Sequence, residues 1–548
     1  MQRNFRICAL LIDIVNKTTY PAEVLVEDGI ITSIQPCEDN LCHTYLLPGF
    51  IDAHVHVESS LLVPSEFARM AVLHGMVGTV SDPHEIANVM GVEGVEFMLN
   101  DASNVPFHFF FGAPSCVPAT QFETAGATLD VDAVDRLLQR DDIWYLAEMM
   151  NYPGVLHNDP EVIAKIASAQ KYNKPVDGHA PGLRGAEVVK YASAGIQTDH
   201  ECFTLDEALD KIQAGMFVQI REGSAARNFE ALHPLLKLHP EKVMLCSDDK
   251  HPDNLLEGHI NLLVKRALDL GYNLYDVLRA SSLHVRNHYN LPVGMLQLGD
   301  SADFIEIDHP DSFKILRTWI RGECVAENGH SLIKSQRPTA INNFVSRSIE
   351  DHEIEVLAGN ENQLRVIEAY EGQLITGTFA FKHGKETGEK IESFPDADIL
   401  KIVVVNRYEN KPPAVAFIKN LGLKSGAFAS TVAHDSHNII AAGCDDQSIL
   451  QSIRLLMESN GGLSAVAQHE NFVLPLPVAG LMSNEDAWKI ASDYIQIDQF
   501  VKETLKTPLR APFMTLSFMA LLVIPELKLS DKGLFDGKNF KFCSPFMT

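Results

Sequence analysis

The feature that most constrains the fold is a regular alternation of short apolar runs and amphipathic stretches between residues 46 and 290. Apolar runs such as MVGTVSD, PFHFFFG, YLAEMM and KVMLCSDD alternate with helical patterns such as PEVIAKIASAQKY and GHINLLVKRALDLG. This order predicts repeated βα units and a parallel sheet. The segment is about 245 residues long, close to the roughly 250 residues of a (β/α)8 TIM-like barrel. We therefore predict an α/β fold with such a barrel over residues 48–291.

Short β-rich runs separated by turn residues flank this segment on both sides. RICALLIDIV, AEVLVEDG and ITSIQP precede it, and DFIEID and FKILRTWIRGECVAENG follow it. Runs of this kind are typical of strands. We expect residues 1–47 and 292–335 to form one small β-domain that the barrel interrupts.

A third region begins after the polar stretch KSQRPTAINNF at residues 334–344. Its strand-like runs include LRVIEAY, ILKIVVVNR and AVAFIKN, and QSILQSIRLLMESN has a helical pattern. Residues 345–548 therefore form a separate C-terminal α/β domain in our prediction.

Polar or ionisable residues end almost every predicted strand of the barrel, where enzymes with this fold place their catalytic groups. These residues are His54, His56, Asp82, His84, Glu85, Glu148, His179, His200, Glu201, Arg221, Glu222, Asp248 and Asp249. Imidazoles and carboxylates without a thiolate suit zinc, manganese or ferrous iron, and the set is large enough for two ions. We therefore predict a dinuclear metal site.

Each candidate also has an ordinary structural interpretation. His54 and His56 lie two apart, so on a strand their rings point to the same side and can hold one ion, but two loop histidines would look alike. Glu148 lies in an apolar run, where a buried carboxylate needs a positive partner; a solvated strand end is the alternative. Asp248 and Asp249 could form a turn or cap a helix. The joint placement of all of them at strand ends favours the metal site.

Two other metal motifs and one nucleophile motif are excluded by spacing. His56 and Glu58 form an HxE and Pro36 precedes Cys37, but the order and the next cysteine, Cys42, do not match the zinc nucleobase deaminases. The HExxH and GxSxG patterns are absent.

The charge balance limits the partners. With 72 acidic against 45 basic residues the net charge is −27, which disfavours nucleic acid and anionic membranes, and both the GxxxxGK[ST] and GxGxxG cradles are missing. The apolar run 513–524 is too short to span a membrane. The nine cysteines include no CxxC pair, which predicts a reducing, cytoplasmic location. A small neutral or cationic substrate fits best.

Eight sequence blocks occur in the order known from one family. They are LLPGFIDAHVHVESS, VSDPHEIANVMGVEG, EMMNYPGV, DGHAPGLRG, TDHECF, REGSAARN, CSDDKHPDNLLEGHI and STVAHDSHNIIAAG. Over nearly its whole length the chain resembles the bacterial adenine deaminases of the amidohydrolase superfamily. The resemblance implies a (β/α)8 barrel, a small β-sandwich built from both flanks, and an adenine-deaminase-type C-terminal domain.

The resemblance also implies an activity and a set of ligands. The activity is hydrolysis of adenine to hypoxanthine and ammonia in purine salvage, by a hydroxide that bridges two divalent ions, with Mn²⁺ favoured over Fe²⁺ or Zn²⁺. The implied metal ligands are His54, His56, Glu148, His179, His200 and Asp248. Glu148 bridges the ions where many relatives have a carbamylated lysine, and Asp248 also shuttles protons.

Other residues are candidates for handling the purine. Negative charge moves into the ring during attack at C6, so ring nitrogens must be protonated or hydrogen-bonded. We expect His84 and Glu85 to act as catalytic groups beside Glu148 and Asp248. The expected substrate-binding residues are Arg221, Glu222, Asp249 and His437.

The C-terminal segment 430–438 packs His434, Asp435, His437 and Asn438 beside an apolar run. It is either a polar turn that caps backbone groups or a turn that leans over the barrel mouth, of its own subunit or of a partner, and contacts the purine edge. We expect a homodimer or a higher homo-oligomer.

Two alternatives to adenine deamination stay open. Another dinuclear amidohydrolase could open a cyclic amide with the same metal site, because pocket shape decides the substrate. A barrel that had lost catalysis could serve as an assembly module, although such a protein would have little reason to keep six ligands together.

Overall fold

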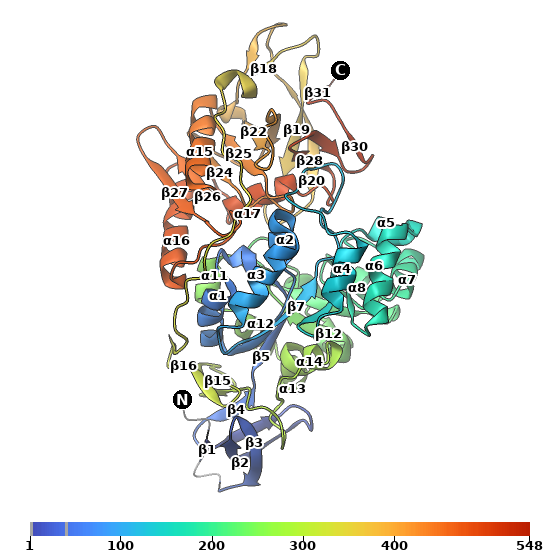
Figure 1. Cartoon of the computed structure of the whole chain (residues 1–548), viewed down its shortest axis with the longest axis vertical. Helices are drawn as coiled ribbons and strands as arrows, with labels where there is room; N and C mark the ends of the chain where they lie inside the picture. Colours follow the sequence, from blue (N-terminus) through green and yellow to red (C-terminus); the bar gives the residue numbers. More distant parts are fainter. Residues whose placement is uncertain (1–3, 39–41, 548) are drawn as a thin grey trace.

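The computed structural model describes residues 4–38 and 42–547, which form three parts along the longest axis (Figure 1). A small sheet that contains the N-terminal strands lies at one end, and a large sheet near the C-terminus lies at the other. The parallel strands and most of the helices lie between them. None of the described helices is long and apolar enough to cross a membrane.

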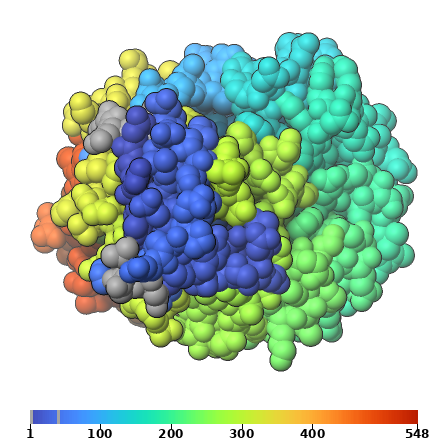
Figure 2. All heavy atoms as spheres, turned by 90° about the horizontal axis from the view of Figure 1, so that it is seen from below, coloured from blue at the N-terminus to red at the C-terminus, as the bar shows by residue number. Residues whose placement is uncertain are grey.

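The small sheet combines strands from both flanks of the central part. Its order is β17-β16-β15-β14-β4-β1-β2-β3. The strands are β1 (Phe5–Asp13), β2 (Thr18–Glu27), β3 (Ile30–Pro36), β4 (Tyr45–Pro48), β14 (Phe304–Ile307), β15 (Ile315–Ile320), β16 (Glu323–Glu327) and β17 (His330–Ser331). The join is β4, which pairs in parallel with β1 and antiparallel with β14. From below, the blue N-terminal residues lie against yellow-green ones (Figure 2). The two flanks therefore do meet in one sheet.

The central strands form two parallel sheets, in the orders β13-β5-β6-β7-β8-β9 and β10-β11-β12. They are β5 (Phe50–His56), β6 (Met76–Ser81), β7 (His108–Ala113), β8 (Ile143–Met149), β9 (Val176–Gly178), β10 (Thr198–Asp199), β11 (Phe217–Arg221), β12 (Val243–Cys246) and β13 (Asp248–Asp249). Every residue of β5 and β6 is buried, as expected for strands covered on both faces. Between the sheets, the Gln197 backbone NH donates to the Val176 carbonyl at 2.9 Å. The parallel strands predicted from the alternation are confirmed.

Helices follow nearly all of these strands. They are α1 (Pro64–Ala71), α2 (His84–Met90), α3 (Val92–Ala102), α4 (Val131–Leu138), α5 (Tyr152–His157), α6 (Pro160–Lys171), α7 (Gly185–Ser193), α8 (Leu205–Gln213), α9 (Phe229–Leu232), α10 (Leu235–Leu238), α11 (Pro252–Glu257), α12 (Ile260–Asp269), α13 (Leu274–Leu278) and α14 (His284–His288). Their starts are fixed locally: the Asp159 side chain accepts from the Glu161 and Val162 NH groups ahead of Pro160, and Thr204 caps α8. Short capped helices keep each strand end at the same edge.

The C-terminal part is built on a mixed sheet in the order β20-β19-β23-β22-β25-β24-β26-β27, with β31 on β19. The strands are β19 (Gln363–Ala369), β20 (Thr376–Lys382), β22 (Ile399–Val405), β23 (Ala414–Lys419), β24 (Ala427–Ser430), β25 (Ile439–Gly443), β26 (Gly462–Val466), β27 (Asn471–Pro475) and β31 (Phe546–Met547). A hairpin sheet of β28 (Leu527–Ser530), β29 (Gly533–Asp536) and β30 (Lys541–Phe542) accompanies it. The helices are α15 (Asp446–Ser459), α16 (Ala487–Glu503) and α17 (Pro512–Ser517), and α16 packs against α1 and α11. One apolar core, with Phe111 and Phe513 among its members, continues from the central part into this one.

A buried carboxylate in α1 joins the central and C-terminal parts. The Glu66 side chain is 0% exposed. One of its oxygens accepts from the Ser335 hydroxyl at 2.6 Å and the Gln336 NH at 3.1 Å, and the other from the Ala487 NH at 2.9 Å and from Arg69. These contacts connect α1 to the linker after β17 and to the first turn of α16.

Glu66→Ala should weaken this junction, because it leaves the NH group of the buried Ala487 unpaired and removes one of the two carboxylates that pair with Arg69, the other being Asp486. The expected cost is about 3 kcal/mol, seen as a lower midpoint of thermal unfolding. Glu96→Ala is the control, since Glu96 is exposed and pairs with Arg140 only at 3.5 Å. Equal midpoints for the two variants would contradict this account of the junction.

Candidate metal centre

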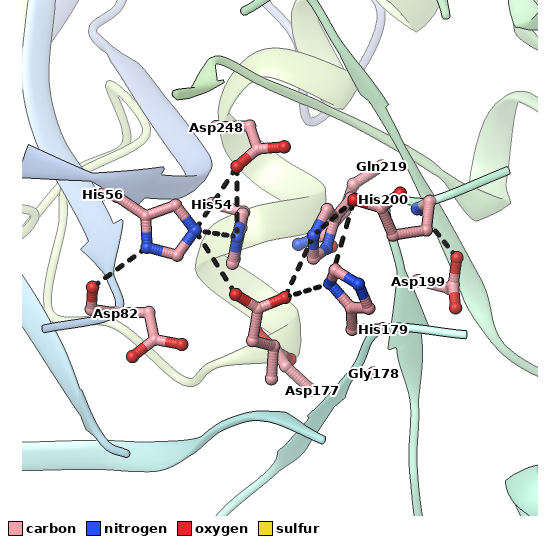
Figure 3. Close-up of polar contacts among 12 residues, drawn as sticks. His54, His56, Asp82, Asp177, Gly178, His179, Asp199, His200, Gln219 and Asp248 are labelled. Atoms are coloured by element: carbon pink, nitrogen blue, oxygen red, sulfur yellow. Dashed lines mark hydrogen bonds and ion pairs between the residues drawn. The ribbon is translucent and has the colours of Figure 1, made fainter. Parts of the chain in front are cut away.

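The ends of several parallel strands bring the predicted metal ligands together. His54 and His56 end β5, Glu148 is near the end of β8, His179 follows β9, His200 follows β10, and Asp248 begins β13. Figure 3 shows His54, His56, His179, His200 and Asp248 pointing into one space from different strands. All six side chains are buried. Residues up to about 190 positions apart in the chain thus share one site because parallel strands end at a common edge.

Glu148 lies between two groups of histidines. Its Oε1 is 3.3 Å from His56 Nε2, whereas its Oε2 is 2.5 Å from His179 Nδ1 and 3.2 Å from His200 Nε2. Burial raises the pKa of Glu148, but His179 and His200 outweigh it and hold that pKa well below the usual range. One carboxylate therefore offers a separate oxygen to each group of imidazoles, as a ligand shared by two cations must.

The first group consists of His54, His56 and Asp248. His54 Nε2 and His56 Nε2 are 3.2 Å apart, and Asp248 Oδ1 lies 3.3 Å from His56 Nε2 and 3.8 Å from His54 Nε2. The two ring nitrogens face each other beside carboxylate oxygens, so several electron-pair donors lie close together. This donor set fits a divalent cation of the zinc, manganese or iron type.

Arg221, at the end of β11, contacts Asp248, and the neighbouring Asp248 and Asp249 have pKa values shifted in opposite directions. Its guanidinium pairs with Asp248 Oδ2 and with Glu201, where Nη2 to Oε2 is 2.9 Å. Burial raises the pKa of Asp248, but Arg221 and His56 hold it well below its usual range. The pKa of Asp249 is instead raised, by burial and by the charge of Asp248. Asp248 thus keeps its charge, while Asp249 holds a proton more readily.

A second polar cluster joins α2 to the C-terminal part. The two oxygens of Glu85 contact His434 Nδ1 and His437 Nε2, from the loop between β24 and β25. His84 lies between this cluster and the ligands, with Nδ1 3.5 Å from Glu148 Oε1 and Nε2 3.5 Å from Glu85 Oε1. Burial lowers the pKa of His434, but Glu85 outweighs it and raises that pKa to about 9. The cluster therefore holds a proton close to the ligands.

The cavity beside the ligands is small and has walls from both parts of the molecule. Its volume is only about 20 Å³, so it has little room beyond the side chains that line it. The C-terminal part contributes Leu374, His434, Asp435, Phe518 and Leu521. Lys528 donates hydrogen bonds to two segments of this wall.

The fully buried ammonium of Lys528 donates to two backbone carbonyls of this wall, that of Leu374 at 2.6 Å and that of Phe518 at 2.8 Å. Burial lowers the pKa of Lys528 to about 7. Backbone carbonyls are its only hydrogen-bond partners among the described residues. The cation therefore connects two segments of the cavity wall that lie far apart in the sequence.

The structure brings most of the predicted site residues into this cavity. Five of the six expected metal ligands line it together with His84, Glu85, Arg221 and Asp249. The sixth, His54, is not part of the lining and lies 3.2 Å from His56. His437 contacts Glu85 from outside the lining. Glu222 is not brought there: it follows Arg221 and points away, 3.2 Å from Arg266 Nη1, because neighbouring residues of a strand project to opposite faces.

Sequence reasoning missed the apolar wall and Lys528. Leu374, Phe518 and Leu521 look like ordinary core residues in the sequence, and no pattern marks Lys528. Asp435 was recognisable only as a member of the polar segment 430–438. Glu201, a strand-end candidate without an assigned role, is the partner of Arg221.

Comparisons with known proteins match both halves of the chain. Residues 45–325 match the amidohydrolase family and residues 373–541 match the adenine deaminase C-terminal domain. The chain is 52% identical to the adenine deaminase of Salinibacter ruber, over 100% of both chains. It is 52% identical to that of Sulfurovum sp. over 97% of this chain and 98% of the relative, and 50% identical to that of Methanosarcina mazei over 98% of each.

Glu148→Ala should lower the metal content, because two cations would lose the carboxylate shared between them. The metal-free protein would be reloaded with Mn²⁺ and the bound metal measured by atomic emission. We expect about two equivalents for the parent and fewer for the variant. Glu222→Ala, which removes a carboxylate outside the cavity, is the control. Full occupancy in Glu148→Ala would place the shared ligand elsewhere.

Proposed function

Because this chain belongs to the adenine deaminase family of the amidohydrolases, we propose that it hydrolyses adenine to hypoxanthine and ammonia in purine salvage. The observation that carries the proposal is Glu148, which faces His56 with one oxygen and His179 and His200 with the other. The protein is accordingly a metal-dependent hydrolase that acts on the C–N bond of a cyclic amidine.

We propose that His54, His56 and Asp248 hold one divalent ion, that His179 and His200 hold the second, and that Glu148 binds both. Mn²⁺ is our first choice, with Fe²⁺ and Zn²⁺ as alternatives, since imidazole and carboxylate ligands accept all three. When bound, the ions lower the pKa of water and polarise the reacting centre. The remaining steps depend on protein side chains.

Asp248 is placed to move the proton of the attacking water. Its Oδ1 faces His54 and His56, and its Oδ2 is held by Arg221, so the carboxylate is both ionised and oriented. In the proposed reaction Asp248 accepts a proton as the oxygen of water bonds to C6 of adenine. It then passes that proton to the amine, which leaves as ammonia when the C6–N bond breaks. Arg221 acts as a positioning residue, because its guanidinium already binds Glu201 and Asp248.

The cluster of His84, Glu85 and His434 supplies the second proton in this scheme. As water adds to C6, charge develops on the ring nitrogens, and a proton held between Glu85 and His434 can neutralise it. When the C6–N bond breaks and the C6 hydroxyl becomes a carbonyl, the hydroxyl proton returns to the cluster and restores it. His437 fixes the second oxygen of Glu85. Asp249, which accepts from the Ser59 hydroxyl at 2.5 Å and has a raised pKa, is placed to hydrogen-bond the purine edge.

We also infer that the two central parallel sheets form one (β/α)8 barrel over residues 48–291. Pairing of β13 with β5 and the Gln197–Val176 hydrogen bond support this closure. In the same proposal residues 1–47 and 292–335 form the β-domain and residues 345–548 the C-terminal domain. A cytoplasmic location is supported by the nine cysteines, all free thiols in the described structure.

Replacing Asp248 by Asn should retain much of the metal, because five ligands remain, yet remove the proton carrier. We expect a loss of several orders of magnitude in kcat, measured by the absorbance change from adenine to hypoxanthine. Asp249→Asn is the matched neighbour and should lose less, mainly through KM. A nearly unchanged rate for Asp248→Asn together with an inactive Asp249→Asn would reverse the two assignments.

Adenine should be preferred over adenosine, because the small cavity below Leu374 and Phe518 leaves little room for a sugar on the purine. We expect kcat/KM for adenosine to be at least about 100-fold lower. Both substrates would be compared on the same manganese-loaded preparation. Similar values would point to a nucleoside deaminase instead.

A further inference from the structure

A second cavity lies on the far side of the strand ends that carry the metal ligands. Its volume is about 100 Å³, and its ionic lining consists of Glu222, Arg227, Lys250, Glu257, Arg266 and Arg510. We call it the basic cavity. Glu222 directly follows Arg221 and Lys250 directly follows Asp249, so the basic cavity and the metal centre share the ends of β11 and β13.

The basic cavity has an excess of positive charge in an acidic protein. Four cationic side chains face two carboxylates there, although the whole chain has a net charge of −27. Burial and the neighbouring Arg510 lower the pKa of Arg227. Like charges gathered in this way raise the free energy of the protein unless an anion lies among them.

Lys250 brings a buried cationic donor without a protein partner among the described residues to the basic cavity. Its side chain is nine-tenths buried, with 6% of the residue exposed, and its ammonium forms no hydrogen bond or ion pair with any residue in 4–38 or 42–547. A buried cation normally has a partner. Lys250 therefore offers the basic cavity a donor for an anion.

Arg510 adds a donor from the C-terminal part. Its guanidinium also forms no hydrogen bond or ion pair within the described part of the chain, whereas its backbone NH donates to Glu371 at 3.1 Å. Arg266 pairs with Glu222 at 3.2 Å and with Glu230 outside the cavity lining, and it lies 4.3 Å from the Phe229 ring centroid. Arg227 meets Glu222 only at 3.8 Å. Several guanidinium NH groups thus remain available.

We propose that the basic cavity binds a small phosphate-type dianion, either free or as a phosphate ester. Lys250 and Arg510, which form no ion pair among the described residues, match the two negative charges of such an anion, and guanidinium groups donate well to the oxygens of a phosphate. The site goes beyond the proposed deamination, because neither adenine nor hypoxanthine carries a phosphate. The ligand would contact both the barrel strand ends and the C-terminal part.

Calorimetric titration of the manganese-loaded full-length protein with inorganic phosphate tests the site. Arg510→Gln and Lys250→Met should weaken binding by about tenfold or more, since each removes a charge-assisted donor. Arg136→Gln is the control, because Arg136 is an exposed cation of α4 away from the cavity. We expect it to bind like the parent. The exposed Arg510 keeps the test valid if Lys250→Met does not fold.

Other outcomes are also decisive. Equal affinity in all variants, or no binding by the parent at millimolar phosphate, would overturn the proposal. Binding that persists in Arg510→Gln but disappears from metal-free protein would assign the phosphate to the metal centre instead. Ribose 5-phosphate, which has no purine, separates two supporting results: tighter binding than phosphate indicates an ester ligand, and equal or weaker binding indicates the free anion. Dissociation of a dimer by Arg510→Gln, without phosphate binding by the parent, would show that a second copy fills the cavity.

Discussion

The site depends on one carboxylate that is shared between two groups of imidazoles. Glu148 is buried, so it needs positive partners, and His56 on one side and His179 and His200 on the other face its two oxygens. This arrangement is possible only if β5, β8, β9 and β10 end at the same edge. The parallel order of the strands, their capped helices and the buried apolar runs between them all serve that alignment.

The C-terminal part completes what the central part begins. Metal ligands come from the strand ends, but the groups that hold Glu85 and the apolar wall come from residues after 370. His434 and His437 contact the two oxygens of Glu85. Lys528 donates hydrogen bonds to the backbone carbonyls of Leu374 and Phe518 in the wall. One apolar core runs through both parts, so the wall and the ligands pack on the same core. The cavity between them has little excess space, which favours a small planar substrate.

Neighbouring residues at the ends of β11 and β13 face two different cavities. Arg221 turns inward to Asp248 and Glu201, whereas Glu222 turns outward to Arg266. In the same way Asp249 lines the metal-side cavity and Lys250 the basic cavity. Adjacent residues therefore serve opposite faces. An anion in the basic cavity would contact Lys250, which directly follows Asp249 of the metal-side cavity, and would stay outside that metal-side cavity.

The sequence by itself determined the features that repeat locally. The βα alternation, the HxH pair and the polar strand ends predict parallel strands and a ligand set, because period and spacing are properties of neighbouring residues. Only the tertiary structure decided which way Glu222 points, that Leu374 and Phe518 close the cavity, and that Lys528 supports them. It also gathered Arg227, Lys250, Arg266 and Arg510 from positions up to about 280 residues apart. Packing between distant segments sets such contacts, and no local pattern records it.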